Sequence, residues 1–480
     1  MRLAKLIMLR RVRWFSGTVS LGLLSLSTVS NAQDNSPYSR YGLGDMVPAS
    51  SITTRGMAGI SAGYADYTSI NFSNPASYSN FFSIKEKSSD KLQSGRAILD
   101  VGLNLSNRTL IAPNTPNRFT ASDIFFSYVQ VGVPLKKNWG LSFGIRPVSR
   151  ISYLINREEV LKNPVPPPDT ISNSITQFKG SGGSYLPTIG TGFGITLSEK
   201  DANNIKKTSI ASFGGNLGYL FGSRDNTALR SLADTTTRFY SSNHTTNSSF
   251  GDIFLNTGFQ YQFENLNRTK KQSTIFRIGI SGNWKQNLNG SKDSLRETFT
   301  LGSAGEQIQI DSVYEQRNIK GQVVYPASYR AGFTFQKSDI ETGRSWLFGA
   351  DYSQMKWSEY RFFGQPDEVQ DSWEINVGAQ YYPRPKANYF SRVVYRLGVT
   401  KASDYINVQN KDLPVIGFSY GMGLPIGGYN RLNPYAFSML NLAFEFSKRG
   451  NNDNPLKENM FRISAGFNLS DLWFIKKKYD

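Results

Sequence analysis

Residues 373–381 read WEINVGAQY, and residues 461–469 read FRISAGFNL. In the first stretch Trp373, Ile375 and Val377 alternate with polar or small residues, and the second stretch alternates in the same way. Successive side chains of a strand point to opposite faces of a sheet, whereas a helix would mix the two sets. Each stretch has about the 9 to 11 residues that a tilted strand needs to cross a bilayer. Both stretches therefore predict membrane-spanning strands.

The same alternation fits about fourteen segments of the chain. They are residues 97–107, 122–133, 139–155, 187–198, 209–222, 251–263, 273–287, 321–335, 344–357, 372–383, 389–400, 415–424, 436–447 and 460–470. No run of 18 apolar residues follows the amino terminus, so the sequence does not predict helical spans. The predicted fold class is all-β: a transmembrane antiparallel β-barrel of about 14 strands in the cell outer membrane.

The connectors between these segments alternate in length. The longest connectors cover residues 156–186, 223–250 and 288–320, which are predicted to be long loops. Outer-membrane barrels have long extracellular loops and short periplasmic turns, so the alternation orients the barrel. The lysine doublets that begin at Lys136, Lys206 and Lys270 lie in predicted periplasmic turns, where they could meet anionic lipid headgroups or simply keep the turns soluble.

The amino terminus carries an export signal. Residues 1–13 contain five basic side chains and no acidic one, an apolar and serine-rich stretch follows, and Ser30-Asn31-Ala32 precedes Gln33. Small residues at these positions predict a cleaved signal peptide at residues 1–32. The chain has a formal net charge of +18, but the excess outside the leader is scattered, so we do not expect nucleic-acid binding. The absence of cysteine suits an exported protein.

Residues 33–96 lack sustained alternation and are rich in turn-forming residues. Glycine permits positive φ and a close approach of two backbones, as a plug threaded into a barrel lumen requires. We therefore expect a hatch at residues 33–96, the barrel at residues 97–474 and a basic tail at residues 475–480. The expected hatch motif consists of Tyr41, Gly42, Gly44, Arg55, Gly56, Gly59, Asn74, Pro75 and Ala76.

Part of this motif resembles a known family. Arg55-Gly56-Met57-Ala58-Gly59, followed by Asn74-Pro75-Ala76, is similar to the hatch of the FadL family of outer-membrane transporters for hydrophobic compounds. The resemblance implies a fourteen-stranded barrel with its amino-terminal segment inside, which agrees with the count of alternating segments. The aromatic pair Trp473-Phe474 resembles the end of a terminal barrel strand, although six further residues follow it.

The resemblance also implies a route for a ligand. Members of the family bind fatty acids or other apolar molecules near the hatch and release them sideways at a kink in the third strand. The third predicted strand here contains Gly144 and Pro147. Proline removes a donor from the strand ladder, so these two residues are candidates for a lateral exit, with an ordinary proline near the strand end as the alternative.

The lumen face, in contrast, is not uniformly apolar. By alternation Arg277, Asp351 and Arg392 point inward, and we expect two lumen charge pairs, Glu374 with Arg396 and Glu445 with Arg462. Buried charges of one sign would be costly, so pairing is expected. Such pairs would stiffen the lumen or hold the hatch, or alternatively line a route for a charged ligand.

No catalytic, metal or cofactor site is expected. The chain has one histidine, His244 in the predicted loop 223–250, and no cysteine, so the usual histidine-activated nucleophile is not indicated. The acidic residues show no calcium-loop spacing.

Two functional hypotheses remain. The first is a FadL-like channel for uptake of small hydrophobic molecules such as fatty acids. The second is a FadL-like barrel that serves as a non-transport subunit or shuttle of a larger outer-membrane secretion or assembly complex. Under this hypothesis the chain resembles PorV-like members of the family. The expected partners are outer-membrane lipid, a hydrophobic ligand under the first hypothesis, and other outer-membrane or periplasmic proteins under the second.

Overall fold

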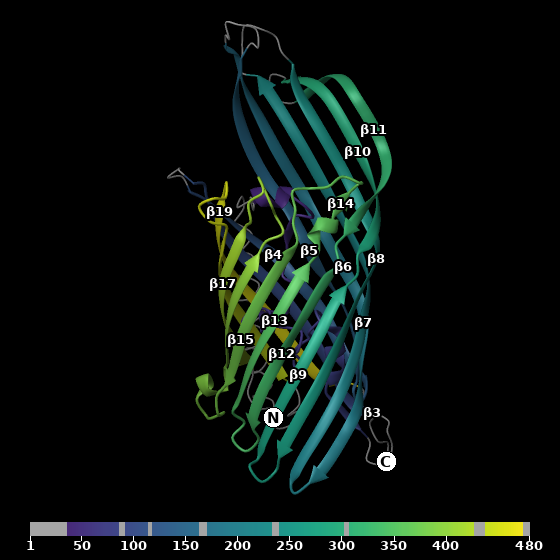
Figure 1. Ribbon diagram of the computed structural model, residues 1–480, viewed down its shortest axis with the longest axis vertical. Coiled ribbons are helices and arrows are strands. Elements are labelled where there is room, and N and C mark those ends of the chain that lie inside the picture. Colours follow the sequence, from purple (N-terminus) through teal and green to yellow (C-terminus); the bar gives the residue numbers. More distant parts are fainter. Residues whose placement is uncertain are drawn as a thin grey trace, which may run out of the picture.

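The computed structural model describes residues 36–85, 92–113, 118–162, 170–232, 240–301, 307–426 and 437–473. Within these residues, 14 antiparallel strands form a closed barrel, as predicted (Figure 1). The strands are β3 (Leu92–Ile111), β4 (Arg118–Lys136), β5 (Trp139–Lys162), β6 (Thr170–Ala202), β7 (Ile205–Leu232), β8 (Ser241–Asn267), β9 (Gln272–Asn283), β12 (Ser328–Asp339), β13 (Ser345–Met355), β15 (Ser372–Tyr382), β16 (Val394–Ser403), β17 (Pro414–Ile426), β18 (Phe437–Arg449) and β19 (Lys457–Trp473). Pairing of β19 with β3 closes the ring. The predicted signal peptide and basic tail lie outside the described residues.

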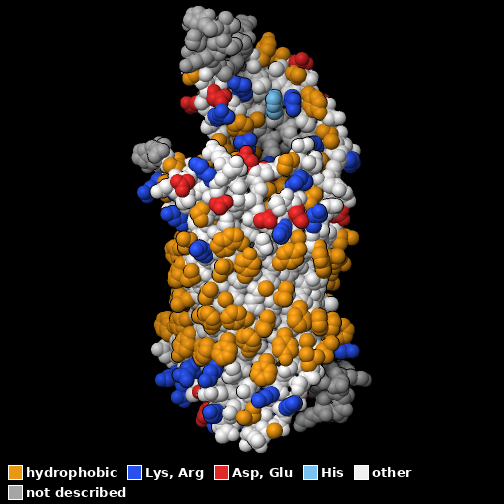
Figure 2. Space-filling view, in the orientation of Figure 1, with side chains coloured by type: hydrophobic (Ala, Val, Ile, Leu, Met, Phe, Trp, Pro, Cys, Tyr) orange, Lys and Arg blue, Asp and Glu red, His pale blue; other side chains and the backbone are white. Residues whose placement is uncertain are grey.

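The outer surface of the barrel carries an apolar belt. Figure 2 shows hydrophobic side chains gathered around the middle of the wall, with lysine and arginine below them and charges of both signs above. Leu217, Ile280 and Leu397 are among the exposed apolar residues that the alternation turns outward. A belt of this kind matches the hydrocarbon layer of a membrane, which the strands cross. In the described part of the chain, no helix is long and apolar enough to cross a bilayer.

One half of the wall is much taller than the other. Residues predicted as the long loops 156–186, 223–250 and 288–320 are largely strand: β5, β6, β7 and β8 continue beyond the barrel rim, together with β10 (Gln286–Leu301) and β11 (Gln307–Tyr325) (Figure 1). The loop prediction was therefore wrong for most of these residues. The physical reason for this error is clearest in β11. Residues 307–318 of β11 are exposed on both faces, so no alternation of apolar residues marks them as a strand.

The amino-terminal segment lies inside the barrel and leads into β3. It contains η2 (Pro37–Arg40), β1 (Asp45–Met46), α2 (Ile52–Arg55), η3 (Pro75–Asn80) and β2 (Ser83–Lys85). We call residues 36–85 the hatch. The first wall strand begins at residue 92 instead of the predicted 97, because Leu92 and Ser94 pair with β2 and the ladder with β19 continues as far as Trp473 opposite Gly95.

Two further connections shape the ends of the barrel. The connection between β13 and β15 holds η4 (Trp357–Glu359) and β14 (Arg361–Phe362), and lies at the tall end. The connection between β15 and β16 holds η5 (Tyr389–Arg392) at the opposite end. Arg392 was expected in a strand with an inward side chain; it lies in this turn instead, because β16 begins only at Val394.

Candidate functional site: the plugged lumen

The hatch is seated against glycines of the wall. Inward-facing glycines from most strands contact hatch backbone or side chains, and we call this set the glycine belt: Gly102, Gly132, Gly140, Gly192, Gly214, Gly258, Gly279, Gly378, Gly398, Gly421 and Gly466. A Cβ on Gly279 would lie 1.8 Å from the carbonyl oxygen of Ala62, and one on Gly214 would lie 2.3 Å from the carbonyl carbon of Pro75. Hatch and wall backbones are therefore in direct contact at these glycines.

Wall side chains satisfy the hatch backbone where it has no ladder of its own. Asp351 accepts hydrogen bonds from the backbone N–H groups of Ser61, at 2.6 Å, and Ala62, at 2.8 Å. Thr334 donates to the carbonyl of Gly63, at 2.7 Å, and Arg277 donates weakly to the carbonyl of Ala65, at 3.4 Å. Buried backbone groups need such partners, so these contacts fix the position of the hatch.

Arg55 is the one charged residue of the expected hatch motif. It is 1% exposed and donates to five oxygens that belong to no carboxylate. Asn104 and Ser127 accept at 2.7 and 2.8 Å, Ser464 accepts at 3.5 Å, and the carbonyls of Ser50 and Pro48 accept at 3.1 and 3.0 Å. The side chain therefore joins the hatch to strands β3, β4 and β19. A buried guanidinium with all these acceptors is a structural anchor.

The rest of the expected motif serves the turns of the hatch. Asn74 caps η3 by accepting from the N–H of Ala76, and its amide donates to the carbonyl of Ala62, at 2.7 Å. The oxygen of Pro75 lies against the glycine belt. Gly42, Gly44 and Gly59 all have positive φ. A Cβ on Gly44 would lie 2.4 Å from the carbonyl oxygen of Arg150, so glycine is required there by close approach as well as by φ.

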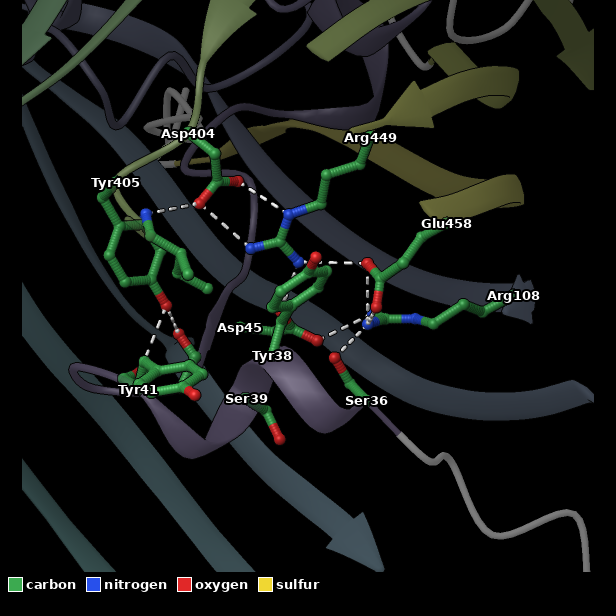
Figure 3. A network of polar contacts seen from close by, with 12 residues as sticks. Ser36, Tyr38, Ser39, Tyr41, Asp45, Arg108, Asp404, Tyr405, Arg449 and Glu458 are labelled. Carbon is green, nitrogen blue, oxygen red and sulfur yellow. Dashed lines mark hydrogen bonds and ion pairs between the residues drawn. The ribbon is translucent and has the colours of Figure 1, made fainter. Parts of the chain in front are cut away.

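A buried network of charges holds the first hatch residues (Figure 3). Asp45 of β1 forms ion pairs with Arg108, at 2.7 Å, and with Arg449, at 3.1 Å. Glu458 pairs with the same two guanidiniums, at 3.2 and 3.1 Å, and Arg449 also pairs with Asp404, at 2.9 Å. The side chains of Arg449 and Glu458 are only 5% and 0% exposed. Sequence reasoning missed all five residues.

Three carboxylates thus share two guanidiniums, and every guanidinium has more than one acidic partner. Burial acts to raise the pKa of Asp45, but Arg108 and Arg449 hold that pKa down at about 2. A carboxyl group with a lowered folded-state pKa contributes stability above its unfolded value of about 3.9, and this contribution is lost as the pH falls toward 2. Asp45 is therefore ionised, and the hatch held, throughout the physiological pH range.

An apolar cluster packs on the hatch from the side of the rim. We call it the apical cluster; its buried members include Tyr38, Leu43, Leu288, Val323, Tyr325, Trp357, Tyr360, Tyr405, Ile406 and Leu413. The rings of Trp357 and Tyr405 stack with centroids 4.1 Å apart. Hydroxyl groups of Tyr360 and Tyr405 donate to the carbonyls of Gly42, at 3.0 Å, and Gly44, at 2.5 Å. The cluster therefore joins the extracellular loops directly to the hatch.

A cavity of about 500 Å³ remains between the hatch and the rim. Its lining is mixed: Phe72, Phe125 and Met355 are apolar, while Arg146, Glu374 and many other lining residues are polar or charged. It does not form the continuous apolar pocket that a conduit for fatty acids would need.

The backbone ladder between β4 and β5 stops beside this cavity. The two strands pair only as far as Val129 with Ile145, one residue beyond Gly144, and β5 bulges between Pro147 and Ser149 against β6. Beyond that point the hatch takes the place of β4: Met46 lies opposite Ser149, and the N–H of Val47 donates to the carbonyl of Val148, at 2.9 Å. Arg150 of β5 also forms an ion pair with Asp123 of β4 across the interruption.

Of the two expected lumen charge pairs, one is formed and the other is not. Glu445 and Arg462 lie opposite each other on β18 and β19, with 3.7 Å between Oε2 and Nη1. The expected pair of Glu374 and Arg396 is wrong. Arg396 lies opposite Gln380 and donates to it and to Asn441, at 2.8 and 2.9 Å.

The register explains the missing pair. Glu374 is six residues along β15 from Gln380, roughly 20 Å at 3.3 Å per residue. Its carboxylate accepts from Asn376 instead, at 2.5 Å.

A double-mutant cycle should separate the two pairs. We expect Glu445→Gln and Arg462→Met to show a coupling free energy of about 0.5 kcal/mol or more. Either substitution alone already removes the partly buried ion pair, so the second one costs less. Glu374→Gln and Arg396→Met should be additive within about 0.3 kcal/mol, because these side chains do not touch. Equilibrium urea unfolding in lipid vesicles measures both cycles. Equal coupling in the two cycles would contradict the register.

The described residues offer no metal site, since no group of three or more acidic or histidine side chains is close enough to share an ion. The single histidine, His244, is exposed in β8 beyond the rim, opposite Arg296 and Ala228. It is therefore remote from the lumen.

Comparison with known proteins adds a family. The model of the BamG family matches residues 9–480. No curated protein matches the chain. Solved structures that match include the CymD monoaromatic hydrocarbon channel, with 14% identity, a TM-score of 0.46 and coverage of 90% of this chain and 99% of that one.

Two further matches have similar values. The Ralstonia pickettii toluene transporter TbuX shows 12% identity and a TM-score of 0.41, with coverage of 89% of this chain and 98% of the other. A FadL homologue of Pseudomonas aeruginosa shows 11% identity and a TM-score of 0.41, with coverage of 91% and 100%.

Proposed function

The chain belongs to the BamG family, and from this membership and the contacts that hold its hatch we propose that it is a structural subunit of a larger outer-membrane complex. The observation that carries the proposal is that the hatch is held at two levels. Below, the hatch lies directly on the glycine belt, and above, the apical cluster ties the loops to Gly42 and Gly44. A plug held by backbone contacts and buried ion pairs stiffens a barrel, as a scaffold requires.

The tall half of the wall supports the same proposal. Strands β5 to β8, β10 and β11 rise above the apolar belt, where lipid does not cover them (Figures 1 and 2). Residues 307–318 of β11 are exposed on both faces. A subunit can present this sheet to other proteins of the complex.

Native purification tests this proposal. We expect a tagged chain, extracted from membranes in mild detergent, to co-purify with at least one other membrane protein in fixed stoichiometry. Native electrophoresis should show a particle larger than the 53.7 kDa chain alone. A lone barrel that carries bound lipid or fatty acid would refute the subunit proposal.

A second candidate function is uptake of small hydrophobic molecules. It is supported by the ladder interruption at Gly144 and Pro147, which lies beside the cavity. Under this alternative Gly144 and Pro147 mark a lateral exit, and residues 45–47 must leave β5 before anything passes. Loss of uptake of a hydrophobic solute after Met46 is cross-linked to Ser149 would favour it; unchanged uptake would exclude that exit.

A further inference from the structure

The turn between β15 and β16 carries two exposed aromatic side chains at the end of the barrel opposite the tall half. Tyr389 and Phe390 belong to η5 and are 41% and 67% exposed. No aromatic side chain in the described part of the chain is more exposed than Phe390. Burial of apolar surface away from water is favourable, so contact with an apolar phase would stabilise this turn.

Hydrogen bonds within the turn fix its backbone. The side chain of Asn388 accepts from the N–H of Phe390, at 3.1 Å, and the hydroxyl of Ser391 donates to the carbonyl of Asn388, at 2.6 Å. The N–H of Lys386 donates to the hydroxyl oxygen of Ser391, at 2.8 Å. The two exposed rings are therefore carried by an ordered turn.

Two tyrosine hydroxyl groups hold this turn against the lipid-facing side of the wall. Tyr395 of β16 donates to the carbonyl of Phe390, at 3.1 Å, and Tyr389 donates to the carbonyl of Pro425 of β17, at 3.2 Å. The next residue of β16, Arg396, is buried in the lumen, so alternation turns Tyr395 outward. Figure 1 shows η5 as the green coil that projects beside the foot of the wall, below β15.

The turn lies at the level of outward aromatic residues on three neighbouring strands. Trp346 of β13, Tyr381 of β15 and Tyr395 are neighbours in register, and Trp346 and Tyr381 are 41% and 46% exposed. Girdles of aromatic residues mark the lipid–water interfaces of outer-membrane barrels. Because Tyr395 bonds to Phe390, η5 lies at such an interface, at the end where Figure 2 shows basic side chains below the apolar belt.

The charges around η5 are all positive. Residues 383–395 contain Arg384, Lys386 and Arg392 and no acidic side chain. The guanidinium of Arg392 lies 5.6 Å from the centroid of the Tyr389 ring, and its Nε is buried without a hydrogen-bond acceptor among the described residues. Cations beside apolar rings suit a membrane interface, where the rings meet the acyl boundary and the cations meet lipid phosphates.

We propose that residues 383–395 form a binding site for anionic phospholipid on the outside of the barrel. Tyr389 and Phe390 enter the interfacial layer of the leaflet, and Arg384, Lys386 and Arg392 bind the phosphate groups of its headgroups. The site lies outside the lumen and moves no ligand; it fixes the depth of this end of the barrel in the membrane. It does not depend on the proposed role as a complex subunit.

A spin label tests the depth of the turn, because the natural chain has no cysteine. A nitroxide is attached to Phe390→Cys in the full chain, reconstituted in vesicles of phosphatidylglycerol and phosphatidylcholine. We expect it to collide mainly with oxygen, which concentrates in the membrane, and little with a water-soluble nickel chelate. Tyr240→Cys, 58% exposed at the start of β8 in the tall half, is the matched control and should show the opposite preference.

A second label tests the choice of headgroup and leaves both aromatic rings in place. A fluorophore on Ala387→Cys, which is exposed within the turn, is quenched by brominated lipids in the vesicles. We expect brominated phosphatidylglycerol to quench it about threefold more than brominated phosphatidylcholine, because the basic side chains gather anionic lipid. Arg384→Gln combined with Lys386→Gln should abolish this preference.

A charge-matched control separates the site from the general charge of this end. Lys270→Gln combined with Lys271→Gln removes the same charge from the turn between β8 and β9 and should keep the preference. The proposal is overturned if the label at residue 390 is as open to the nickel chelate as the label at residue 240, or is shielded from both reagents as a protein contact would be. It is equally overturned if the two double variants quench alike.

Discussion

Gly214→Ala is expected to unseat the hatch and to lower the free energy of unfolding by about 2 to 3 kcal/mol, the cost of forcing an extra group into a closely packed interior. The added Cβ would lie 2.3 Å from the carbonyl carbon of Pro75 and 2.4 Å from its oxygen. These are backbone atoms of the turn that Asn74 caps, so no side-chain rotation relieves the contact. The hatch or β7 must move.

The neighbouring residue provides the control. Gly215 points to the outer face of the same strand, and the nearest atom to a Cβ there is 3.8 Å away. Gly215→Ala should therefore be neutral or slightly stabilising, because alanine loses less chain entropy than glycine on folding. Urea unfolding followed by tryptophan fluorescence, and proteolysis of the hatch in folded protein, compare the two variants. Equal midpoints for both would mean that the hatch is not seated on the glycine belt.

Much of this arrangement could be predicted from the sequence, because alternation and turn formation depend on residues that are close together in the chain. A strand in a membrane wall must alternate, so stretches such as residues 373–381 predict the barrel and its strand number. Turn chemistry at Asn74 and Pro75 likewise predicts a compact segment outside the wall. Pro147 lies where the ladder of β4 and β5 ends, because a residue without an N–H cannot hold a regular pair.

The predictions that failed depended on the register between strands and on the height of a residue along the barrel. Alternation shows which side chains point inward but not the level at which they lie, and the pairing of Glu374 with Arg396 assumed a short turn after β15. The connection actually includes η5, so β16 begins at Val394 and Arg396 meets Gln380. The strand extensions beyond the rim were predicted as loops for another reason: outside the membrane, neither face of a strand has to be apolar.

The buried charge network was inaccessible because its members are far apart in the chain. Asp45 and Arg449 are 404 residues apart, and Arg108 and Glu458 are 350 apart. None belongs to a motif, and each alone is an ordinary charge near a strand end. Only closure of β19 onto β3 brings Arg108 and Glu458 together. In the hatch, glycines were expected to be sites of close approach, but the matching glycines of the wall were not recognised.

Arg449→Met is expected to release the first hatch residues and to destabilise the barrel by about 3 to 5 kcal/mol, because removing one partner of a buried ion pair leaves the other charges uncompensated. Asp45 and Glu458 would then share only Arg108, and Asp404 would lose its ion pair. The side chain also lies over the ring of Tyr38, so packing at η2 is lost as well.

The measurement combines unfolding with a local reporter. Ser39→Cys is buried and bonded to Ser152 in the folded protein, so its reactivity toward a water-soluble maleimide reports release of η2. Arg317→Met is the matched control: Arg317 is 79% exposed in its ion pair with Glu315, and its loss should cost no more than about 0.5 kcal/mol.

A conservative variant keeps the test decisive if the Arg449→Met protein does not fold. Arg449→Lys retains the positive charge but cannot reach Asp404 and Glu458 at once, since an ammonium lacks the planar fork of a guanidinium. It should fold, with an intermediate loss of stability and partial reactivity of the Ser39→Cys thiol. If Arg449→Lys and Arg317→Met give the same stability and the thiol stays protected in both, the charge network does not hold the hatch, and the glycine belt alone must do so.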